Sequence, residues 1–169
     1  DRPLADSFDY VIIGAGSAGC ILANRLTADG KHTVCLLEAG PPDWNPYIHI
    51  PAGFMKTLVN PAVNWLYESE PSEGTAGRRI PAPRGKTLGG SSSINGMLYV
   101  RGNPADYDGW AQRGCRGWTH DEVLPFFKHS EDFRSGGDAK APGGHRGRGG
   151  ELAVEEYRTI LPLTHKFIE

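Results

Sequence analysis

The sequence lacks the features that mark a membrane protein or a nucleic-acid-binding protein. No apolar run approaches the roughly 20 residues that cross a bilayer, so no membrane span is expected. The net charge of −2 gives no electrostatic reason to expect nucleic acid or an anionic membrane as a partner. The start of the chain is not a signal-peptide core. We expect a soluble, cytoplasmic protein; because the chain begins at Asp1 without a methionine, a secreted protein is the alternative.

Cysteine is scarce, and histidine lacks the spacing of a metal site. Cys20, Cys35 and Cys115 form no C-x-x-C pair. We interpret the first two as core residues and the third as a structural residue in a turn. The six histidines include no H-x-x-x-H pair, so no metal site is expected. A G-x-S-x-G motif with a following aspartate and histidine is also missing, which leaves acyl transfer without support.

The N-terminal part of the chain carries the pattern of a dinucleotide-binding βαβ unit. Residues 8–13 form an apolar run rich in β-branched and aromatic side chains, which predicts a strand. The run breaks into the sequence Gly-Ala-Gly-Ser-Ala-Gly at residues 14–19, a helical pattern continues to Gly30, and a second apolar run covers residues 33–37. Glu38 follows directly. Strand, G-x-G-x-x-G turn, helix, strand and acidic residue in this order are the dinucleotide fingerprint.

Each glycine of this turn has its own physical task. Gly14 allows the sharp turn off the strand, Gly16 lets a pyrophosphate approach the backbone, and Gly19 lets helix and sheet lie close together. The N–H groups at the helix start carry the positive end of the helix dipole and bind an anion without a lysine. Glu38 accepts hydrogen bonds from ribose hydroxyls and repels a 2′-phosphate, which disfavours NADP. The fingerprint itself leaves FAD and NAD open, and its alternative is a glycine turn in an ordinary α/β unit.

Residues 41–61 are rich in proline, which prevents long regular elements. Two interpretations stay open for this segment: local packing, and a lid over a cofactor or substrate entrance. Residues 64–70 alternate in polarity and predict a strand. Aromatic residues across the segment indicate an ordered structure, since a solvated loop needs no such apolar area; they are Trp44, Tyr47, Phe54, Trp65 and Tyr67.

A second glycine-rich stretch covers residues 84–97, Arg-Gly-Lys-Thr-Leu-Gly-Gly-Ser-Ser-Ser-Ile-Asn-Gly-Met. Its composition is typical of a flexible linker. An apolar pattern, however, resumes at once with Ile94 and residues 97–100. We therefore expect the glycines to bring backbone N–H and hydroxyl groups against a polar or anionic group, such as a cofactor's phosphates or the edge of an isoalloxazine ring.

The remaining residues give local signals for helices, a loop and a strand. A surface helix is predicted to begin at Pro104, and a capping box at residues 119–122 precedes a further helix with Pro125 in its first turn. Residues 134–150 are glycine-rich without apolar periodicity, which favours a mobile surface loop over an anion site. A short strand is predicted over residues 151–154. A helix is predicted to begin at Pro162.

Taken together, these motifs resemble the glucose-methanol-choline (GMC) oxidoreductases, FAD enzymes that oxidise alcohols. The residues that carry the resemblance lie at 9–19, 37–40, 84–97 and 104–110. The match runs over nearly the whole chain, and the combination is far more specific than any one of its motifs. In character it is closest to choline-dehydrogenase-like and aromatic-alcohol-oxidising members.

The resemblance implies an α/β fold in a fragment of a larger chain. A Rossmann-like FAD-binding βαβ domain with an extended loop and lid region would be followed by the beginning of a substrate domain. The expected divisions are the FAD-binding domain at residues 5–134, a glycine-rich loop at 135–150, and the incomplete substrate-binding domain at 151–169.

The same resemblance implies a set of FAD-binding residues. The first glycine turn would hold the diphosphate and Glu38 the adenosine ribose, while residues 89–91 approach the diphosphate and ribityl chain and residues 95–98 the flavin ring. Some members attach FAD through a histidine just before the asparagine; here Ile94 stands at that position, so we predict a non-covalent FAD. The expected cofactor-binding residues are Gly14, Gly16, Ser17, Ala18, Glu38, Ala39, Arg84, Gly89, Gly90, Ser91, Asn95, Gly96, Met97 and Leu98.

The implied reaction is oxidation of a primary alcohol to an aldehyde by hydride transfer to flavin N5. The family's catalytic histidine and its paired histidine or asparagine lie near the end of a much longer chain, so no catalytic residue is assigned here. The expected partners are a small-molecule alcohol and the remaining C-terminal part of the same enzyme. Two alternatives stay open: an FAD-containing cyanohydrin (hydroxynitrile) lyase on the same scaffold, and a non-catalytic dinucleotide-binding module.

Overall fold

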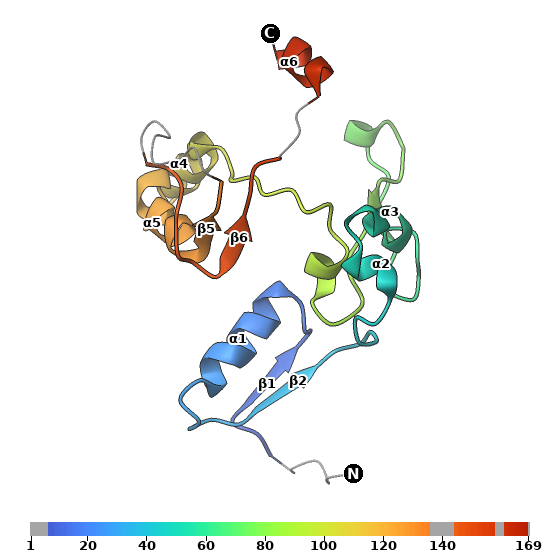
Figure 1. Ribbon diagram of the computed structural model, residues 1–169, viewed down its shortest axis with the longest axis vertical. Coiled ribbons are helices and arrows are strands. Elements are labelled where there is room, and N and C mark those ends of the chain that lie inside the picture. The colour runs from blue at the N-terminus through green and yellow to red at the C-terminus, as the bar shows by residue number, and fades with distance from the viewer. Residues whose placement is uncertain (1–6, 136–143, 158–160, 169) are drawn as a thin grey trace. The chain divides into compact units, whose positions relative to one another are not determined.

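The computed structural model describes residues 7–135, 144–157 and 161–168 (Figure 1). The fold is mixed α/β, as expected. The chain divides into two compact units, Asp1–Leu98 (unit 1) and Tyr99–Glu169 (unit 2). The domain boundaries expected at residues 134 and 150 stay predictions.

Unit 1 begins with the βαβ element that the glycine fingerprint predicts. β1 (Tyr10–Ile13) and β2 (Val34–Leu37) run parallel, and α1 (Ser17–Thr27) lies between them in the chain (Figure 1). The Asp9 carboxylate ties the starts of the two strands together, because it accepts hydrogen bonds from the Thr33 N–H at 2.7 Å and the Thr33 hydroxyl at 2.8 Å. These bonds hold the pKa of Asp9 below its usual range. The order strand, turn, helix, strand is confirmed.

Helix α1 is more exposed than its apolar pattern predicts. In this fully described helix Gly19 is the one buried residue, and Ile21 and Leu22 are exposed. The interpretation of Cys20 as a core residue is wrong, since its side chain is exposed, while Cys35 on β2 is half-buried. The physical reason is the small area beneath the helix, because the described residues give this sheet two strands.

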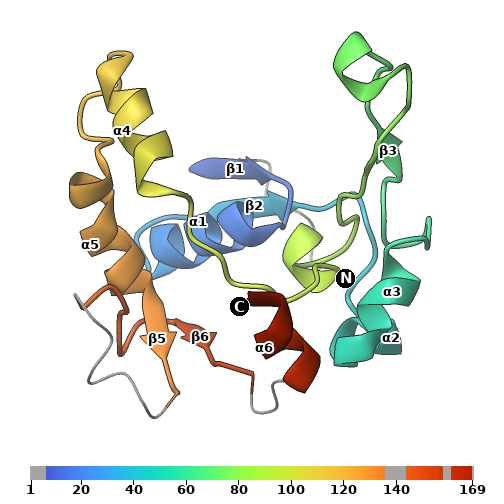
Figure 2. The same cartoon turned by 90° about the horizontal axis from the view of Figure 1, so that it is seen from above.

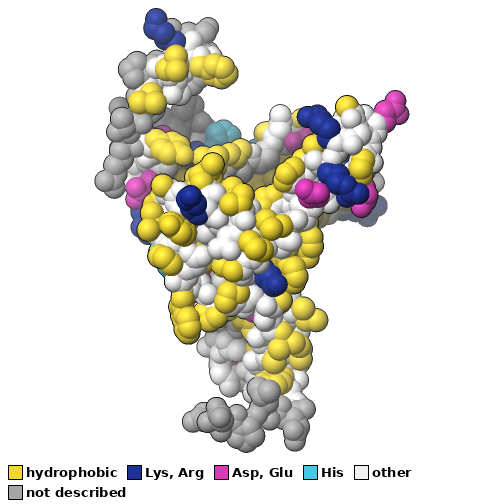
Figure 3. All heavy atoms as spheres, turned by 90° about the vertical axis from the view of Figure 1, so that its right-hand side faces the viewer, with side chains coloured by type: hydrophobic (Ala, Val, Ile, Leu, Met, Phe, Trp, Pro, Cys, Tyr) yellow, Lys and Arg dark blue, Asp and Glu magenta, His cyan; other side chains and the backbone are white. Residues whose placement is uncertain are grey.

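Short helices follow β2, because prolines interrupt the chain at close intervals. They are α2 (Pro46–His49), the 3-10 helix η1 (Pro51–Gly53) and α3 (Phe54–Thr57), and α2 and α3 lie side by side (Figures 1 and 2). Figure 3 shows the molecule from the right-hand side of Figure 1, where α2 and α3 lie, and many hydrophobic side chains are exposed on this face. The short elements confirm the effect predicted for the prolines, whereas a lid function stays a prediction.

Beyond these helices, unit 1 contains a short hairpin. β3 (Tyr67–Glu68) pairs antiparallel with β4 (Pro81–Ala82), and the 3-10 helix η2 (Glu73–Thr75) lies between them in the chain. The strand predicted over residues 64–70 is therefore wrong in length. Leu66 has a left-handed backbone with a φ of 53°, which interrupts an extended strand.

A buried asparagine fixes the backbone on both sides of this hairpin. The Asn64 Nδ2 donates to the Leu58 carbonyl at 2.8 Å. Its Oδ1 accepts from the N–H groups of Leu66 at 3.0 Å and Arg84 at 3.1 Å. One side-chain amide thus joins the backbone of three separate residues by hydrogen bonds, as the ladder of a longer strand pair would. Neither its nitrogen nor its oxygen is left without a partner.

The second glycine-rich stretch is built into unit 1 and is not a linker. It contains the 3-10 helix η3 (Gly90–Ser93), and Thr87 and Ile94 on either side are buried. The Thr87 hydroxyl donates to the Pro41 carbonyl at 2.8 Å, which ties the stretch to the segment that follows β2.

Unit 2 opens with two helices, α4 (Pro104–Gln112) and α5 (His120–Ser130) (Figure 1). α4 begins at its proline, as predicted. The capping box of Thr119 and Glu122 is formed at the start of α5. Pro125 lies in the interior of α5, so its predicted place in the first turn is wrong. Because proline has no N–H, the helix lacks one backbone hydrogen bond at this position.

Unit 2 continues with a parallel strand pair, β5 (Glu131–Phe133) and β6 (Leu152–Val154), and with α6 (Pro162–Ile168). β6 and the start of α6 agree with the sequence pattern. β5 was not predicted, because its three residues continue α5 without a turn signal. Among the residues that the structure describes, no helix has the length and apolar character to cross a membrane.

Part of the glycine-rich loop of unit 2 is hydrogen-bonded to a buried carboxylate. Within its described part, residues 144–150, Arg146 and Gly147 donate hydrogen bonds to the buried Glu131 carboxylate at 2.9 Å and 2.8 Å. The surface position is confirmed for residues 144, 145, 148 and 149, which are exposed, while Arg146 and Gly147 are anchored to β5. The mobility of the loop stays a prediction. At the other end of the predicted loop, the Arg134 N–H donates to the Val154 carbonyl at 2.9 Å, and residues 136–143 lie outside the described residues.

Candidate functional site

The turn between β1 and α1 has the geometry that its glycines predict. Gly14 has a φ of 95°, which a residue with a side chain rarely adopts, and its N–H donates to the Leu37 carbonyl at 2.7 Å. A Cβ on Gly19 would lie 2.0 Å from the Gly14 carbonyl oxygen. The first and third glycines are therefore required for the shape of the turn.

The second glycine-rich stretch lies directly against this turn. The Gly89 N–H donates to the Ala15 carbonyl at 2.8 Å, and a β-bridge pairs Gly89 with Gly16. A Cβ on Gly90 would approach the Gly16 Cα to 2.7 Å. Two motifs that are far apart in the sequence therefore form one continuous surface of glycine backbone.

The start of α1 is open to an anion. Gly16 is the N-cap and supplies no side-chain cap, and the first turn contains no acidic residue in this fully described helix. The N–H groups of Ser17, Ala18 and Gly19 thus keep the partial positive charge of a helix start. A Cβ built on Gly16 would find its nearest neighbour 3.9 Å away, so there is space beside the backbone. This arrangement suits a phosphate or diphosphate.

Glu38 follows β2 directly, and its carboxylate is held against the same turn. Oε2 accepts a hydrogen bond from the Ala15 N–H at 2.8 Å, and Oε1 accepts one from the Gly40 N–H at 2.8 Å. These bonds fix the carboxylate, while each oxygen keeps a further lone pair for a hydroxyl group. The acid is therefore held in one orientation, and the predicted contact with the ribose of a dinucleotide stays a prediction.

A cavity of about 830 Å³ lies among these elements. Most of the residues predicted to bind a cofactor line it. They are Gly14, Gly16, Ser17, Ala18, Glu38, Ala39, Arg84, Gly90 and Ser91.

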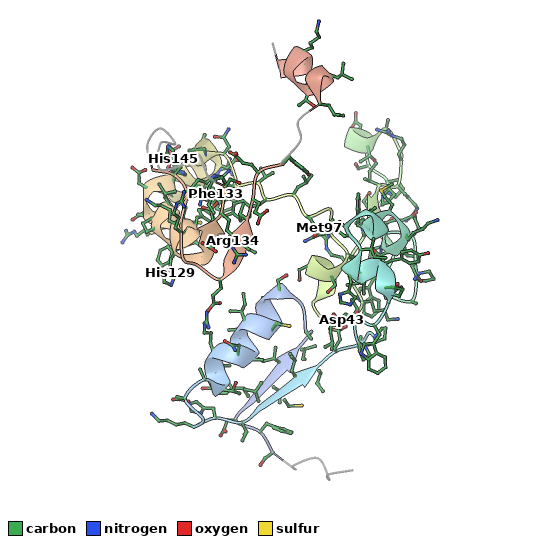
Figure 4. The ribbon with its side chains drawn as sticks, in the orientation of Figure 1. Asp43, Met97, His129, Phe133, Arg134 and His145 are labelled. Carbon is green, nitrogen blue, oxygen red and sulfur yellow. The ribbon has the colours of Figure 1, made fainter. Side chains whose placement is uncertain are left out.

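The other predicted residues do not line this cavity. Gly89 is engaged with the backbone of the turn, and residues 95–98 follow η3, where Figure 4 labels Met97. Met97 has a φ of 57°, and its N–H donates to the Asn95 Oδ1 at 2.8 Å. Met97 and Leu98 are exposed. Contact of residues 95–98 with a flavin ring stays a prediction.

Two aromatic residues that were not assigned to the site form part of the cavity wall. Trp65 and Tyr67 are stacked, with ring centroids 5.8 Å apart and planes inclined by 4°. The Lys86 Nζ lies 4.7 Å from the centre of the Trp65 ring, and the Trp65 N–H donates to the Arg84 carbonyl at 2.9 Å. The available signal was the i, i+2 spacing of two aromatic residues in a segment predicted to be a strand, where such a pair shares one face. In the structure the left-handed Leu66 lies between them, and the rings are stacked nevertheless.

The cavity therefore offers three kinds of interaction. Backbone N–H groups can meet phosphates, Glu38 can meet hydroxyls, and apolar and aromatic side chains can lie against rings. The charged residues of its lining are Glu38 and Arg84. Within the described part of the chain, no group of three or more His, Cys, Asp or Glu side chains could hold a metal ion.

Sequence comparison finds relatives that extend well beyond this chain. An oxygen-dependent choline dehydrogenase from Rhizobium rhizogenes is 48% identical over 95% of this chain. An oxygen-dependent choline dehydrogenase from Brucella ovis is 45% identical over the same share. The chain spans 28% of the length of these curated relatives.

Structural comparison and a family model identify the family. Pyridoxine 4-oxidase from Mesorbium loti superposes with a TM-score of 0.80 at 40% identity, covering 96% of this chain and 31% of that chain. The model of the family described as GMC oxidoreductase matches residues 8–169. Since this match takes in both glycine-rich stretches and the acid between them, the chain belongs to the GMC oxidoreductase family.

Proposed function

We propose that the protein carrying this chain is an FAD-dependent oxidoreductase that oxidises a primary alcohol to an aldehyde, and that this chain supplies much of its FAD-binding site. One observation carries the proposal: the two glycine-rich stretches meet at the uncapped start of α1, beside the fixed carboxylate of Glu38. The names of the relatives, choline dehydrogenase and pyridoxine 4-oxidase, support oxidation as the reaction class. Choline and pyridoxine both carry alcohol groups.

The residues of the large cavity fit FAD. We propose that the N–H groups of Ser17 and Ala18 hold the diphosphate, that Glu38 binds the adenosine ribose, and that Trp65 forms part of the wall against the cofactor. Ile94 is buried in unit 1 and has no group that can form a bond to a flavin. We therefore propose that the FAD is held without a covalent bond.

The chemistry divides between the cofactor and the protein. Bound FAD supplies the acceptor for the hydride that leaves the carbinol carbon. The residues of this chain would bind and orient the cofactor: backbone amides would hold the diphosphate without the entropy cost of ordering long side chains, and the hydrogen-bonded Glu38 would hold the sugar. We place the base that takes the hydroxyl proton outside residues 1–169, in a further part of the protein that also completes the alcohol-binding site.

Flavin release tests the cofactor assignment. The intact protein is purified, denatured with acid and centrifuged, and the absorbance spectra of supernatant and pellet are recorded. We expect the flavin spectrum in the supernatant, as for a non-covalent cofactor. Flavin in the pellet would contradict non-covalent binding, and intact protein without any flavin would contradict the proposed function as a whole.

Anaerobic addition of an alcohol tests the reaction. A primary alcohol is expected to bleach the oxidised flavin spectrum, because reduction removes the long-wavelength absorbance. A flavin that stays oxidised while a cyanohydrin is cleaved would replace the oxidoreductase with the lyase alternative. If the protein binds flavin but turns over neither substrate, the remaining alternative is a non-catalytic dinucleotide-binding module.

A further inference from the structure

Unit 2 contains a cavity of its own, with a volume of about 340 Å³. It is lined by residues that lie outside the two glycine-rich stretches of unit 1 and have no part in the proposed flavin site. They are Tyr99, Val100, Arg101, His145 and Arg146.

The cavity lies against two guanidinium groups that share a single carboxylate. Arg146 Nη1 donates to the Glu131 Oε1 at 2.9 Å, and Arg101 Nη2 donates to the Glu131 Oε2. Within the described residues, Glu131 is the one acid at ion-pair distance from Arg101 and Arg146. Two positive charges therefore face one negative charge, and the cluster keeps a surplus of one positive charge beside the cavity.

The two arginines differ in how much of their donor capacity is used. Arg101 is 16% exposed, and its Nε, Nη1 and Nη2 donate to the Tyr99 hydroxyl, the His145 carbonyl and Glu131. The Arg146 side chain is 37% exposed, and among the described residues its one hydrogen-bond partner is Glu131, through Nη1. Of the two, Arg146 is therefore both the more exposed and the one with more N–H donors left for a further anion.

Two aromatic rings lie within cation–π distance of the Arg146 guanidinium. Its central carbon lies 4.9 Å from the centre of the Phe133 ring and 5.9 Å from that of Tyr99. Figure 4 shows Phe133 and His145 in the same part of unit 2. A planar cation held in this way presents the fork of donors that matches a carboxylate. Tyr99 and Val100 add apolar surface to the same cavity.

We propose that this cavity binds a small monoanion: one carboxylate on a flat, largely apolar body. The carboxylate would meet the remaining donors of Arg146, and the body would lie against Tyr99 and Val100. The single surplus charge favours one negative charge on the ligand. The volume lies near the lower end of the roughly 300–1,000 Å³ of small-molecule sites, which limits the ligand to about the size of one ring.

Calorimetric titration of the intact, flavin-loaded protein with benzoate at constant ionic strength tests this proposal. Arg146→Met is expected to weaken benzoate binding by about tenfold or more, because charge-assisted hydrogen bonds are lost. Arg148→Met is the matched control: it removes the same charge two residues further on, from an exposed side chain outside the cavity lining. We expect it to change the dissociation constant by less than about twofold.

A second variant tests the shape of the site without changing its charge. The Val100 side chain is 84% exposed at the edge of the cavity, so Val100→Trp adds bulk at the entrance and should also weaken benzoate binding. Acetate and inorganic phosphate should bind the unaltered protein less tightly than benzoate does. The proposal is overturned if the unaltered protein does not bind benzoate, if the two arginine variants lose affinity equally, or if acetate or phosphate binds as tightly. Circular dichroism and flavin content establish that each variant is folded; should Arg146→Met unfold, Val100→Trp decides alone.

Discussion

The two units of the chain provide for negative charge in opposite ways. In unit 1, the candidate anion site is backbone: the uncapped N–H groups of Ser17 and Ala18, with Gly16 and Gly90 in place of side chains. In unit 2, the anion is a side chain of the protein itself, Glu131, which is 0% exposed and held by two arginines and a backbone N–H. The first arrangement is open to a ligand. In the second, the buried anion position is occupied by Glu131 of the chain itself, and Arg146 also lines a cavity.

The difference shows which arrangement serves binding and which serves folding. Helix-start amides carry partial charges that water can solvate, so the fold does not depend on the anion's presence. A buried carboxylate and its guanidinium partners are full charges, and each costs several kcal/mol if the other is removed. Changes at the glycine surface of unit 1 should therefore affect cofactor affinity more than stability, and changes at Glu131 should do the reverse.

Glu131→Ala is expected to have the largest effect. Removing the carboxylate leaves the half-buried Arg146 and the more deeply placed Arg101 without their shared acid, and breaking such a buried pair typically costs about 3–5 kcal/mol. Hydrogen exchange of β5 and β6, read by mass spectrometry in the intact protein, reports the local opening free energy and should show the loss.

Asp121→Ala supplies the control for this measurement. Its side chain is 98% exposed and lies 3.5 Å from the His120 Nδ1 on the same unit, so its removal should change protection by less than about 1 kcal/mol. If β5 and β6 are as strongly protected from hydrogen exchange in Glu131→Ala as in Asp121→Ala, Glu131 is not the anchor of unit 2.

Gly16→Ala should separate binding from folding in unit 1. A Cβ at Gly16 has no atom nearer than 3.9 Å, so the fold can accept it, but the methyl group occupies space beside the helix-start amides. We expect FAD to bind about 100-fold more weakly, a loss of roughly 2.7 kcal/mol, with little change in the protein's melting temperature without cofactor. Fluorescence titration of the cofactor-free protein with FAD measures the affinity.

Two further glycines set the limits of this test. Gly74 lies in η2 and does not line the cavity, and a Cβ on it would come no closer than 3.9 Å to another residue, at the Ser72 Oγ. Gly74→Ala should therefore alter neither FAD affinity nor stability. Gly19→Ala would place its Cβ 2.0 Å from a backbone carbonyl and should destabilise the fold by about 1–3 kcal/mol. Unchanged FAD affinity in Gly16→Ala would refute the role assigned to this surface.

Trp65→Ala should have a smaller effect on binding. Trp65 lines the large cavity and stacks on Tyr67, and aromatic contacts of this kind contribute about 0.5–1.5 kcal/mol. FAD affinity should therefore fall by roughly three- to tenfold. Trp44→Ala is the matched control, since Trp44 is 84% exposed and outside the cavity lining. Equal affinities of the two variants would remove Trp65 from the site.

The site in unit 1 could be predicted from sequence where its parts are local. The turn at Gly14, the close approach at Gly19 and the acid at Glu38 belong to one βαβ element, so fixed spacing determines them. The contact of Gly89 with this turn, by contrast, depends on long loop closures such as the bond from Thr87 to a segment after β2. No periodic signal in the sequence reports such a closure.

The cluster of unit 2 shows why a buried charge was missed. Glu131 follows a helix whose last turn is polar, and it precedes an aspartate, so its sequence context is that of an exposed residue. Its partners Arg101 and Arg146 lie 30 and 15 residues away in the chain, without a shared motif. Leu66 was missed for a related reason: its left-handed backbone follows from the amide of Asn64, which its own residue type does not indicate.

One aspartate in each unit extends the comparison of the two units to single carboxyl groups. Both have a lowered pKa, but the main cause differs. In unit 1, the pKa of Asp9 is lowered by the Thr33 backbone N–H and then by the Thr33 hydroxyl. In unit 2, the pKa of Asp132 is lowered by a hydrogen bond from the Arg134 guanidinium and then by the Gly149 N–H. Neutral donors lead in the first case, with a smaller coulombic contribution from His32, and a cation leads in the second.

Salt should therefore distinguish the two carboxyls. Because both folded pKa values lie below their unfolded values, each group stabilises the fold above the ordinary carboxyl pKa of about 3.8 and loses that contribution as the pH falls through the lowered pKa. Added salt screens the charge of Arg134, so the pKa of Asp132 should rise toward its ordinary value while that of Asp9 changes less. NMR titration of both carboxyl carbons at low and high salt measures the shifts. Equal shifts would mean that Asp132 is stabilised as Asp9 is, by neutral donors, and that the contrast between the units does not extend to their surfaces.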